Sequence, residues 1–137
     1  MKYLLAILLF LNVVPAFSQK VNSRYERSKK DNAKLLGSVL QVDNIVSITV
    51  TNYAGKHTLT QKELVVLKGY LKQAREVGGL TVKPQHVMLD IRMKGNKSAG
   101  YVYTTTGTVH FDSSSGPGRS CRGSWDLPIM LNFENYR

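Results

Sequence analysis

The stretch HVMLDIRMKGNKSAGYVYTTTGTVHFD, residues 86–112, decides the fold of this chain. From residue 86 to residue 94 apolar and polar positions alternate, and one set would face a core: Val87, Leu89, Ile91 and Met93. Successive side chains of a β-strand point to opposite faces, so this pattern predicts a half-buried strand. GNKSA and Gly107 then punctuate two further β-rich runs. The stretch therefore predicts an antiparallel meander of three strands.

The GNKSA turn fixes how the second strand of the meander faces. If the turn joins Lys94 to Gly100, Met93 lies opposite Tyr101 and Ile91 opposite Tyr103. Tyrosine then meets an aliphatic side chain in both pairs, which favours this register. We expect the two tyrosines on the core face.

The loop around Gly107 has two candidate lengths. A three-residue loop, 105–107, with Gly107 in the left-handed conformation, places Val109 and Phe111 beside the tyrosines. A two-residue loop, Thr106-Gly107, would instead send Val109 and Phe111 to the polar face of this arrangement. We therefore expect the three-residue loop.

Two His/Asp pairs, His86 with Asp90 and His110 with Asp112, could suggest a metal or acid–base site. In the expected register His110 shares an outward row with Arg92, whereas His86 lies on the order of 20 Å from His110. Ligands bond zinc at about 2 Å and must be close neighbours. We therefore expect a solvated sheet face with no metal and no cofactor. Arg92 and His110, with Lys94 and nearby tyrosines, remain a candidate patch for a phosphate or carboxylate.

Upstream of the meander the sequence predicts one strand and one helix. IVSITVT, residues 45–51, is β-branched and is expected to bury Val46, Ile48 and Val50. TQKE, residues 60–63, is a capping box that opens a helix through about Val77. Four residues at helical spacing form its apolar face: Leu64, Leu67, Leu71 and Ala74. Gly78-Gly79 would end it.

Downstream, LPIMLNFENYR, residues 127–137, alternates Ile129, Leu131 and Phe133 and predicts a last strand. A short helix starting at Pro128 is the alternative. Together the elements predict a single α+β domain over residues 39–137. Its one main helix packs across an antiparallel sheet of about four to five strands.

The first 18 residues have the pattern of a secretory signal peptide. Lys2 precedes the apolar run YLLAILLFLNVV, Pro15 breaks it, and AFS supplies small residues before a cleavage site. The run is shorter than the roughly 20 residues that span a bilayer. We expect cleavage near Ser18/Gln19 and a secreted or periplasmic location. Residues 19–38 would then form a basic N-terminal arm, or a short helix begun by the Ser23–Glu26 capping box.

The chain is basic, with 19 Lys+Arg against 9 Asp+Glu and a formal net charge of +10. Such a charge favours acidic partners, among them nucleic acid, anionic glycans, lipid headgroups or an acidic protein. The same charge also serves solubility alone, so it indicates an anionic ligand without selecting one.

The polar run SSSGPGRSCRGS, residues 113–124, contains the one cysteine of the chain. Arg119 and Arg122 flank Cys121 and are expected to favour its thiolate. With Trp125 they are the candidate residues for binding a partner protein through this loop. One alternative is a disordered surface loop whose cysteine is incidental, and another is a Cys121 that pairs with a partner chain or a second copy.

The order of helix followed by meander resembles the cystatins, a family of cysteine-protease inhibitors. The resemblance is one of topology. GNKSA stands where cystatins carry a Gln-Val-Val-Ala-Gly-type hairpin after the helix, and Trp125 follows Ser124 instead of a proline. We predict a non-enzymatic secreted or periplasmic binding module, in its sharpest form a protein (protease) inhibitor that acts through residues 113–124.

The competing hypothesis is a small basic secreted hydrolase acting on nucleic acid. It rests on a fold-level analogy with small secreted ribonucleases, whose sheets carry His, Arg and a carboxylate. A carboxylate within reach of His57, His86 or His110 would favour it. The sequence has no glycine-rich phosphate loop, no zinc-finger spacing and no serine elbow.

Overall fold

A computed structural model describes residues 19–28, 32–77, 87–105, 107–112, 119–131, 133–134 and 136. The expected signal peptide, the Gly78-Gly79 stop, His86 and residues 113–118 of the polar run lie outside this part of the chain.

The described elements are, in chain order, β1 (Gln19–Val21), α2 (Ser23–Ser28), the 3₁₀ turns η2 (Leu36–Ser38) and η3 (Val42–Asn44), β2 (Ile45–Asn52), β3 (Gly55–Thr58), α3 (Gln61–Gln73), β4 (Arg75–Val77), β5 (Met88–Met93), β6 (Lys97–Ser98), β7 (Val102–Thr104), β8 (Thr108–Phe111), the 3₁₀ turn η4 (Arg119–Cys121), β9 (Gly123–Asp126) and β10 (Ile129–Leu131).

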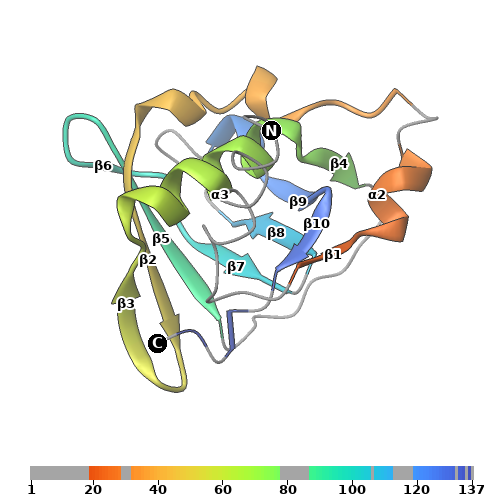
Figure 1. Ribbon diagram of the computed structural model, residues 1–137. Coiled ribbons are helices and arrows are strands. Elements are labelled where there is room, and N and C mark those ends of the chain that lie inside the picture. The colour runs from red at the N-terminus through yellow and green to blue at the C-terminus, as the bar shows by residue number, and fades with distance from the viewer. Residues whose placement is uncertain are drawn as a thin grey trace, which may run out of the picture.

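The main sheet is antiparallel and runs in the order β3-β2-β5-β7-β8-β9-β4, with β6 also paired to β5 (Figure 1). β1 and β10 form a separate two-stranded sheet. The mixed helix-and-sheet class is therefore confirmed. The sheet is larger than expected, with eight strands in the described part of the chain. The extra strands β3, β4, β6 and β9 come from segments that the sequence assigned to turns, to the end of the helix and to the 113–124 loop. The predicted last strand lies outside the main sheet, as β10 of the two-stranded sheet.

Helix α3 begins as its capping box predicts. The Glu63 amide donates to Thr60 Oγ1 at 3.3 Å, and the Thr60 amide donates to Glu63 Oε2 at 2.9 Å. Leu64, Leu67, Leu71 and Ala74 are buried, as expected. The helix nevertheless ends at Gln73, before the expected Val77, because residues 75–77 pair with β9 as β4.

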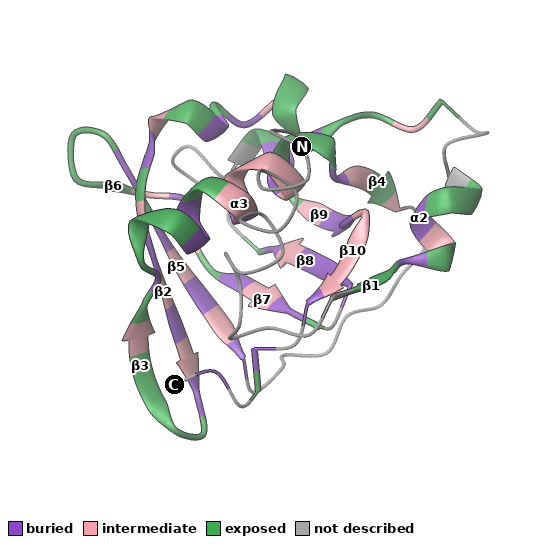
Figure 2. Ribbon diagram, viewed as in Figure 1, coloured by how far each residue is buried: buried purple, intermediate pink, exposed green. Residues whose placement is uncertain are grey.

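Strand β2 carries a correction to its predicted face. Val46 is 47 % exposed, while Ile45, Ile48 and Val50 are buried. Figure 2 shows bands of different burial alternating along β2. Pairing with β5 shifts by one residue between Ile45 and Ser47. Such a bulge turns the residues on its two sides toward different faces, which the period-two pattern could not foresee.

The meander register also differs from the expected one. Ser98 pairs with Arg92, but Val102 pairs with Leu89, so the chain shifts by one residue between β6 and β7. Gly100 lies in this bulge with a φ of +95°, a left-handed conformation that glycine tolerates. As a result Val102 faces the core, and Tyr101 is 65 % exposed.

The loop around Gly107 is the shorter of the two candidates. Thr104 pairs with Val109 and Tyr103 with His110. The Thr105 amide donates to the Thr108 carbonyl at 2.9 Å, which leaves two residues between them. Val109 and Phe111 remain in the core all the same, because Val102 and not the tyrosines occupies the apolar face. The expected three-residue loop is therefore wrong.

The segment before residue 39 packs against the sheet. β1 pairs with β10, and the Asn22 side-chain amide donates to the carbonyls of Gly107 at 3.1 Å and Leu127 at 2.9 Å. Tyr25 and Leu36 are buried. Helix α2 covers Ser23–Ser28. β10 is a strand, as the sequence predicted.

Among the described helices, none has the length and apolar character needed to cross a membrane.

Candidate binding surface

The two faces of the main sheet have different chemistry. One face, with α3 across it, carries the apolar side of the alternation, for example Ile48, Leu89 and Ile91. The opposite face carries the polar partners of these residues and is called here the open face. It includes Thr49, Asp90, Tyr103 and His110, each partly exposed in the described structure.

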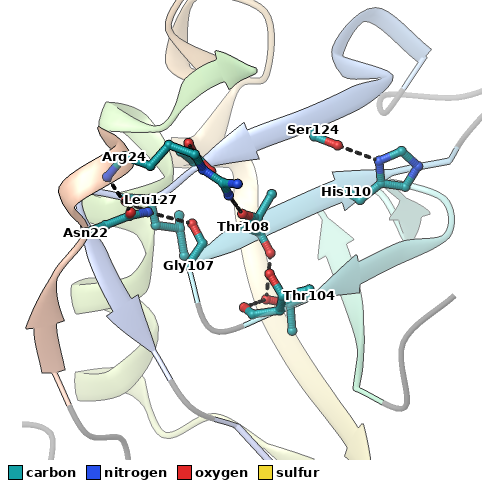
Figure 3. Close-up of polar contacts among 10 residues, drawn as sticks. Asn22, Arg24, Thr104, Gly107, Thr108, His110, Ser124 and Leu127 are labelled. Carbon is teal, nitrogen blue, oxygen red and sulfur yellow. Dashed lines mark hydrogen bonds and ion pairs between the residues drawn. The ribbon is translucent and has the colours of Figure 1, made fainter. Parts of the chain in front are cut away.

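At one end of the open face, α2 places Arg24 on the buried Asp126. Figure 3 shows the Arg24 side chain reaching Thr108. Arg24 Nε donates to Asp126 Oδ2 at 2.7 Å and its Nη2 donates to Oδ1 at 2.6 Å. The Thr108 hydroxyl donates to Oδ1 at 2.9 Å. Asp126 is fully buried, and both of its oxygens are engaged. This network fastens the N-terminal segment to the sheet and gives each Asp126 oxygen at least one donor.

His110 lies beside this network and pairs with Ser124, not with Arg92. Its Nδ1 is 3.0 Å from Ser124 Oγ, and Figure 3 shows the pair apart from Arg24. Its row across the sheet contains Tyr103 and Met88. Arg92 lies four residues further along β5, about 13 Å away along the strand. The structure therefore does not bring the predicted Arg92–His110 patch together.

Two of the residues predicted to bind a partner through the 113–124 loop, Cys121 and Trp125, are more buried than expected. Cys121 is fully buried, and burial raises the pKa of its thiol to about 11. The expected thiolate is wrong, since desolvation disfavours the charged form. Trp125 is 1 % exposed and donates from Nε1 to the Cys121 carbonyl at 2.7 Å. Arg122 is exposed, whereas the side chain of Arg119 is outside the described part.

A second buried network closes the end of the core near the C-terminus. The Tyr136 hydroxyl donates to Glu63 Oε2 at 2.6 Å, and the Asn52 side chain donates to the carbonyls of Phe133 and Tyr136. Burial and the hydrogen bond to Glu63 raise the pKa of Tyr136. The ring of His57 meets that of Tyr136 edge-on, with centroids 5.9 Å apart. Glu63 thus caps α3 and holds the C-terminal segment.

Across the described residues, no group of three or more His, Cys, Asp or Glu side chains is arranged to hold a metal ion.

The open face is hollowed where β3, β2, β5 and the chain after β6 lie side by side. The groove has a volume of about 530 Å³. Its principal side chains are those of Thr49, Thr51, Lys56, Asp90, Arg92 and Tyr101. Two cations, one carboxylate, three hydroxyl residues (with Ser98), an aromatic ring and the apolar Met88 therefore line one hollow.

The bulge at Gly100 explains why Tyr101 borders this groove. The Gly100 amide donates to Ser98 Oγ at 3.2 Å, and the left-handed backbone reverses the side-chain alternation. Bulges often re-aim a side chain next to a functional site. The ring of Tyr101 is exposed and does not pack into the core, so its place at the rim of the groove favours contact with a ligand.

Arg92 and Asp90 form an ion pair inside the groove. Arg92 Nε and Nη2 both donate to Asp90 Oδ2, at 3.2 Å and 3.1 Å. The side chains are 49 % and 44 % exposed. Exposed pairs of this kind contribute about 0–1 kcal/mol. A ligand can therefore rearrange this pair at little energetic cost.

No protein-family model, curated protein or solved structure gives a significant match to this chain. The fold and the site therefore rest on this chain's own residues. Sequence reasoning identified Arg92 but missed Thr49, Thr51, Lys56 and Tyr101. The sequence signal for the bulge was Gly100 directly before Tyr101 at the start of a strand.

Proposed function

We propose that this protein is a non-enzymatic binding module, exported through residues 1–18, that holds an anionic ligand in the groove on the open face. The observation that carries the proposal is the convergence of Lys56 and Arg92 on one hollow that a re-aimed Tyr101 borders. A basic chain draws anionic ligands toward such a groove by long-range attraction.

The polar networks favour binding over catalysis. Asp126 is neutralised by Arg24, and Glu63 is held by its helix cap and by Tyr136. A general acid or base needs a proton-transfer partner in reach of substrate. These two carboxylates face their own structural partners, so the groove with its exposed side chains is the better candidate for ligand contact.

The groove also supports the proposal better than the 113–124 loop. Protease capture through a thiolate would need an accessible, ionised Cys121, and this thiol is buried with a raised pKa. Arg122 is then the one described side chain of that loop's binding set that is exposed.

A matched pair of double variants tests the proposal. Lys56→Gln/Arg92→Gln removes two cations from the groove, whereas Lys20→Gln/Lys34→Gln removes two exposed cations elsewhere. Anisotropy with a fluorescent heparin-derived hexasaccharide gives the affinity, and thermal melts check folding. We expect the groove variant to bind with at least about tenfold lower affinity, because the two charges that it lacks contact the ligand. Equal losses in both variants would mean that net charge alone attracts the probe and would contradict the proposal.

A further inference from the structure

We propose that the ligand of the groove is an acidic saccharide, a sugar chain that carries carboxylate or sulfate groups. This inference rests on the proposed function and names the chemistry of its ligand.

Asp90 supplies the first argument. A carboxylate accepts hydrogen bonds and donates none. Asp90 lines the groove, and in the described contacts Arg92 donates to its Oδ2 and not to its Oδ1. The phosphodiester groups of a nucleic acid offer acceptors only and give Oδ1 no donor. Sugar hydroxyls are donors, so a saccharide satisfies this oxygen.

The cations supply the second argument. Lys56 and Arg92 both line the groove, and Asp90 offsets only one of them. A neutral sugar would leave the excess cation without a partner. A ligand that combines hydroxyl donors with an anionic group satisfies both Asp90 and the cations, because charge-assisted bonds are the strong ones.

Tyr101 supplies the third argument. Its ring is 65 % exposed, and the bulge at Gly100 holds it at the rim of the groove. A tyrosine offers a flat apolar face with a polar end, and it orders at little conformational cost. The C–H face of a sugar ring can cover that surface, while its hydroxyls reach toward Thr51 and Asp90.

Isothermal titration calorimetry with four probes tests the inference: a galacturonate tetrasaccharide, its methyl ester, a heparin-derived tetrasaccharide and oligo(dT). The ester keeps the sugar and removes the charge. We expect an acidic saccharide to bind at least about tenfold more tightly than the ester or oligo(dT), because hydrogen bonds to ionised groups are the stronger ones. Whichever acidic probe binds more tightly identifies the anion as carboxylate or sulfate.

Asp90→Asn is the decisive variant, because two models predict opposite changes in its affinity for the acidic saccharide. If Asp90 accepts sugar hydroxyls, this variant binds the acidic saccharide about tenfold more weakly. If the groove is only an electrostatic trap, the variant binds every anionic probe more tightly because a repulsive charge is gone. Tyr101→Ala should also weaken saccharide binding about tenfold, and Tyr101→Phe should largely retain it.

The outcomes separate the two proposals. Tighter saccharide binding by Asp90→Asn, or a preference for oligo(dT), overturns the inference that the ligand is a saccharide. The proposal of an anion-binding groove is retained in that case if Lys56→Gln/Arg92→Gln still abolishes binding. Binding of all probes that is insensitive to Lys56→Gln/Arg92→Gln, or no binding by the folded protein, overturns both.

Discussion

Arg24 and Asp126 lie 102 residues apart in the sequence and form a two-pronged ion pair, with donor–acceptor distances of 2.7 Å and 2.6 Å. The Asp126 side chain is fully buried, while that of Arg24 is 43 % exposed. A buried carboxylate is tolerated only when it is paired and hydrogen-bonded. The basic segment that precedes the sheet therefore completes the domain by neutralising its core aspartate.

Arg24→Ala should destabilise the fold by leaving Asp126 unpaired. Breaking a buried ion pair typically costs about 3–5 kcal/mol, and water at the half-exposed guanidinium lowers our expectation to about 2–3 kcal/mol. Urea denaturation measures the change. Arg27→Ala, on the same short helix and exposed, is the matched control and should stay within about 0.5 kcal/mol. Equal stability of the two variants would contradict the structural role of the pair.

The start of helix α3 and the core side of strand β5 were predicted correctly because the signals for each lie within a few residues of the element. The Thr60–Glu63 capping box and the apolar spacing of the helix gave α3 its start and its buried face. The alternation from Val87 to Met93 gave β5 both its extent and its core side.

Features that depend on distant partners could not be predicted in the same way. Residues 75–77 continue a helical pattern, but pairing with β9 draws them into the sheet. The bulges at Val46 and Gly100 each add one residue to a strand, which reverses the face of everything beyond them. The second bulge also created the groove rim at Tyr101, so the error in register and the missed site have the same physical cause.

The observed register makes a prediction that separates it from the expected one. Val102 is fully buried, so Val102→Ala should cost about 2 kcal/mol through lost burial and a residual cavity. Tyr101→Ala should change the free energy of unfolding by no more than about 0.5 kcal/mol, because the Tyr101 ring is exposed. Denaturant melts of both variants compare the two costs. The reverse order would restore the register in which the tyrosines face the core.

The hydroxyl of Tyr136 should stabilise the C-terminal closure through Glu63. Tyr136→Phe removes the 2.6 Å donor from a carboxylate that is only 7 % exposed. Losing a hydrogen bond to a buried acceptor of this kind costs about 1–3 kcal/mol. Tyr101→Phe makes the same chemical change at an exposed ring and should leave the free energy of unfolding unchanged. Two variants of equal stability would show that Glu63 finds another donor at no cost.

Cys121 should be unreactive in the folded protein and should make stability fall at alkaline pH. Burial raises the pKa of its thiol from 9.0 to about 11, so the thiol is protonated at pH 8 in the native state. Ellman's reagent should therefore react at least about a hundredfold faster in urea than in buffer, because the thiolate is the reactive species and unfolding exposes it.

The sign of the pH dependence follows from which state releases its proton first. The unfolded thiol ionises near 9.0 and the folded one near 11, so its contribution is complete below pH 9 and is lost between pH 9 and 11. Cys121→Ala lacks this titration and keeps every other alkaline group. The stability advantage of the natural chain over this variant should shrink as the pH rises from 8 to 11 in urea melts. An advantage that is constant or grows over this range would mean that Cys121 is not buried as a protonated thiol.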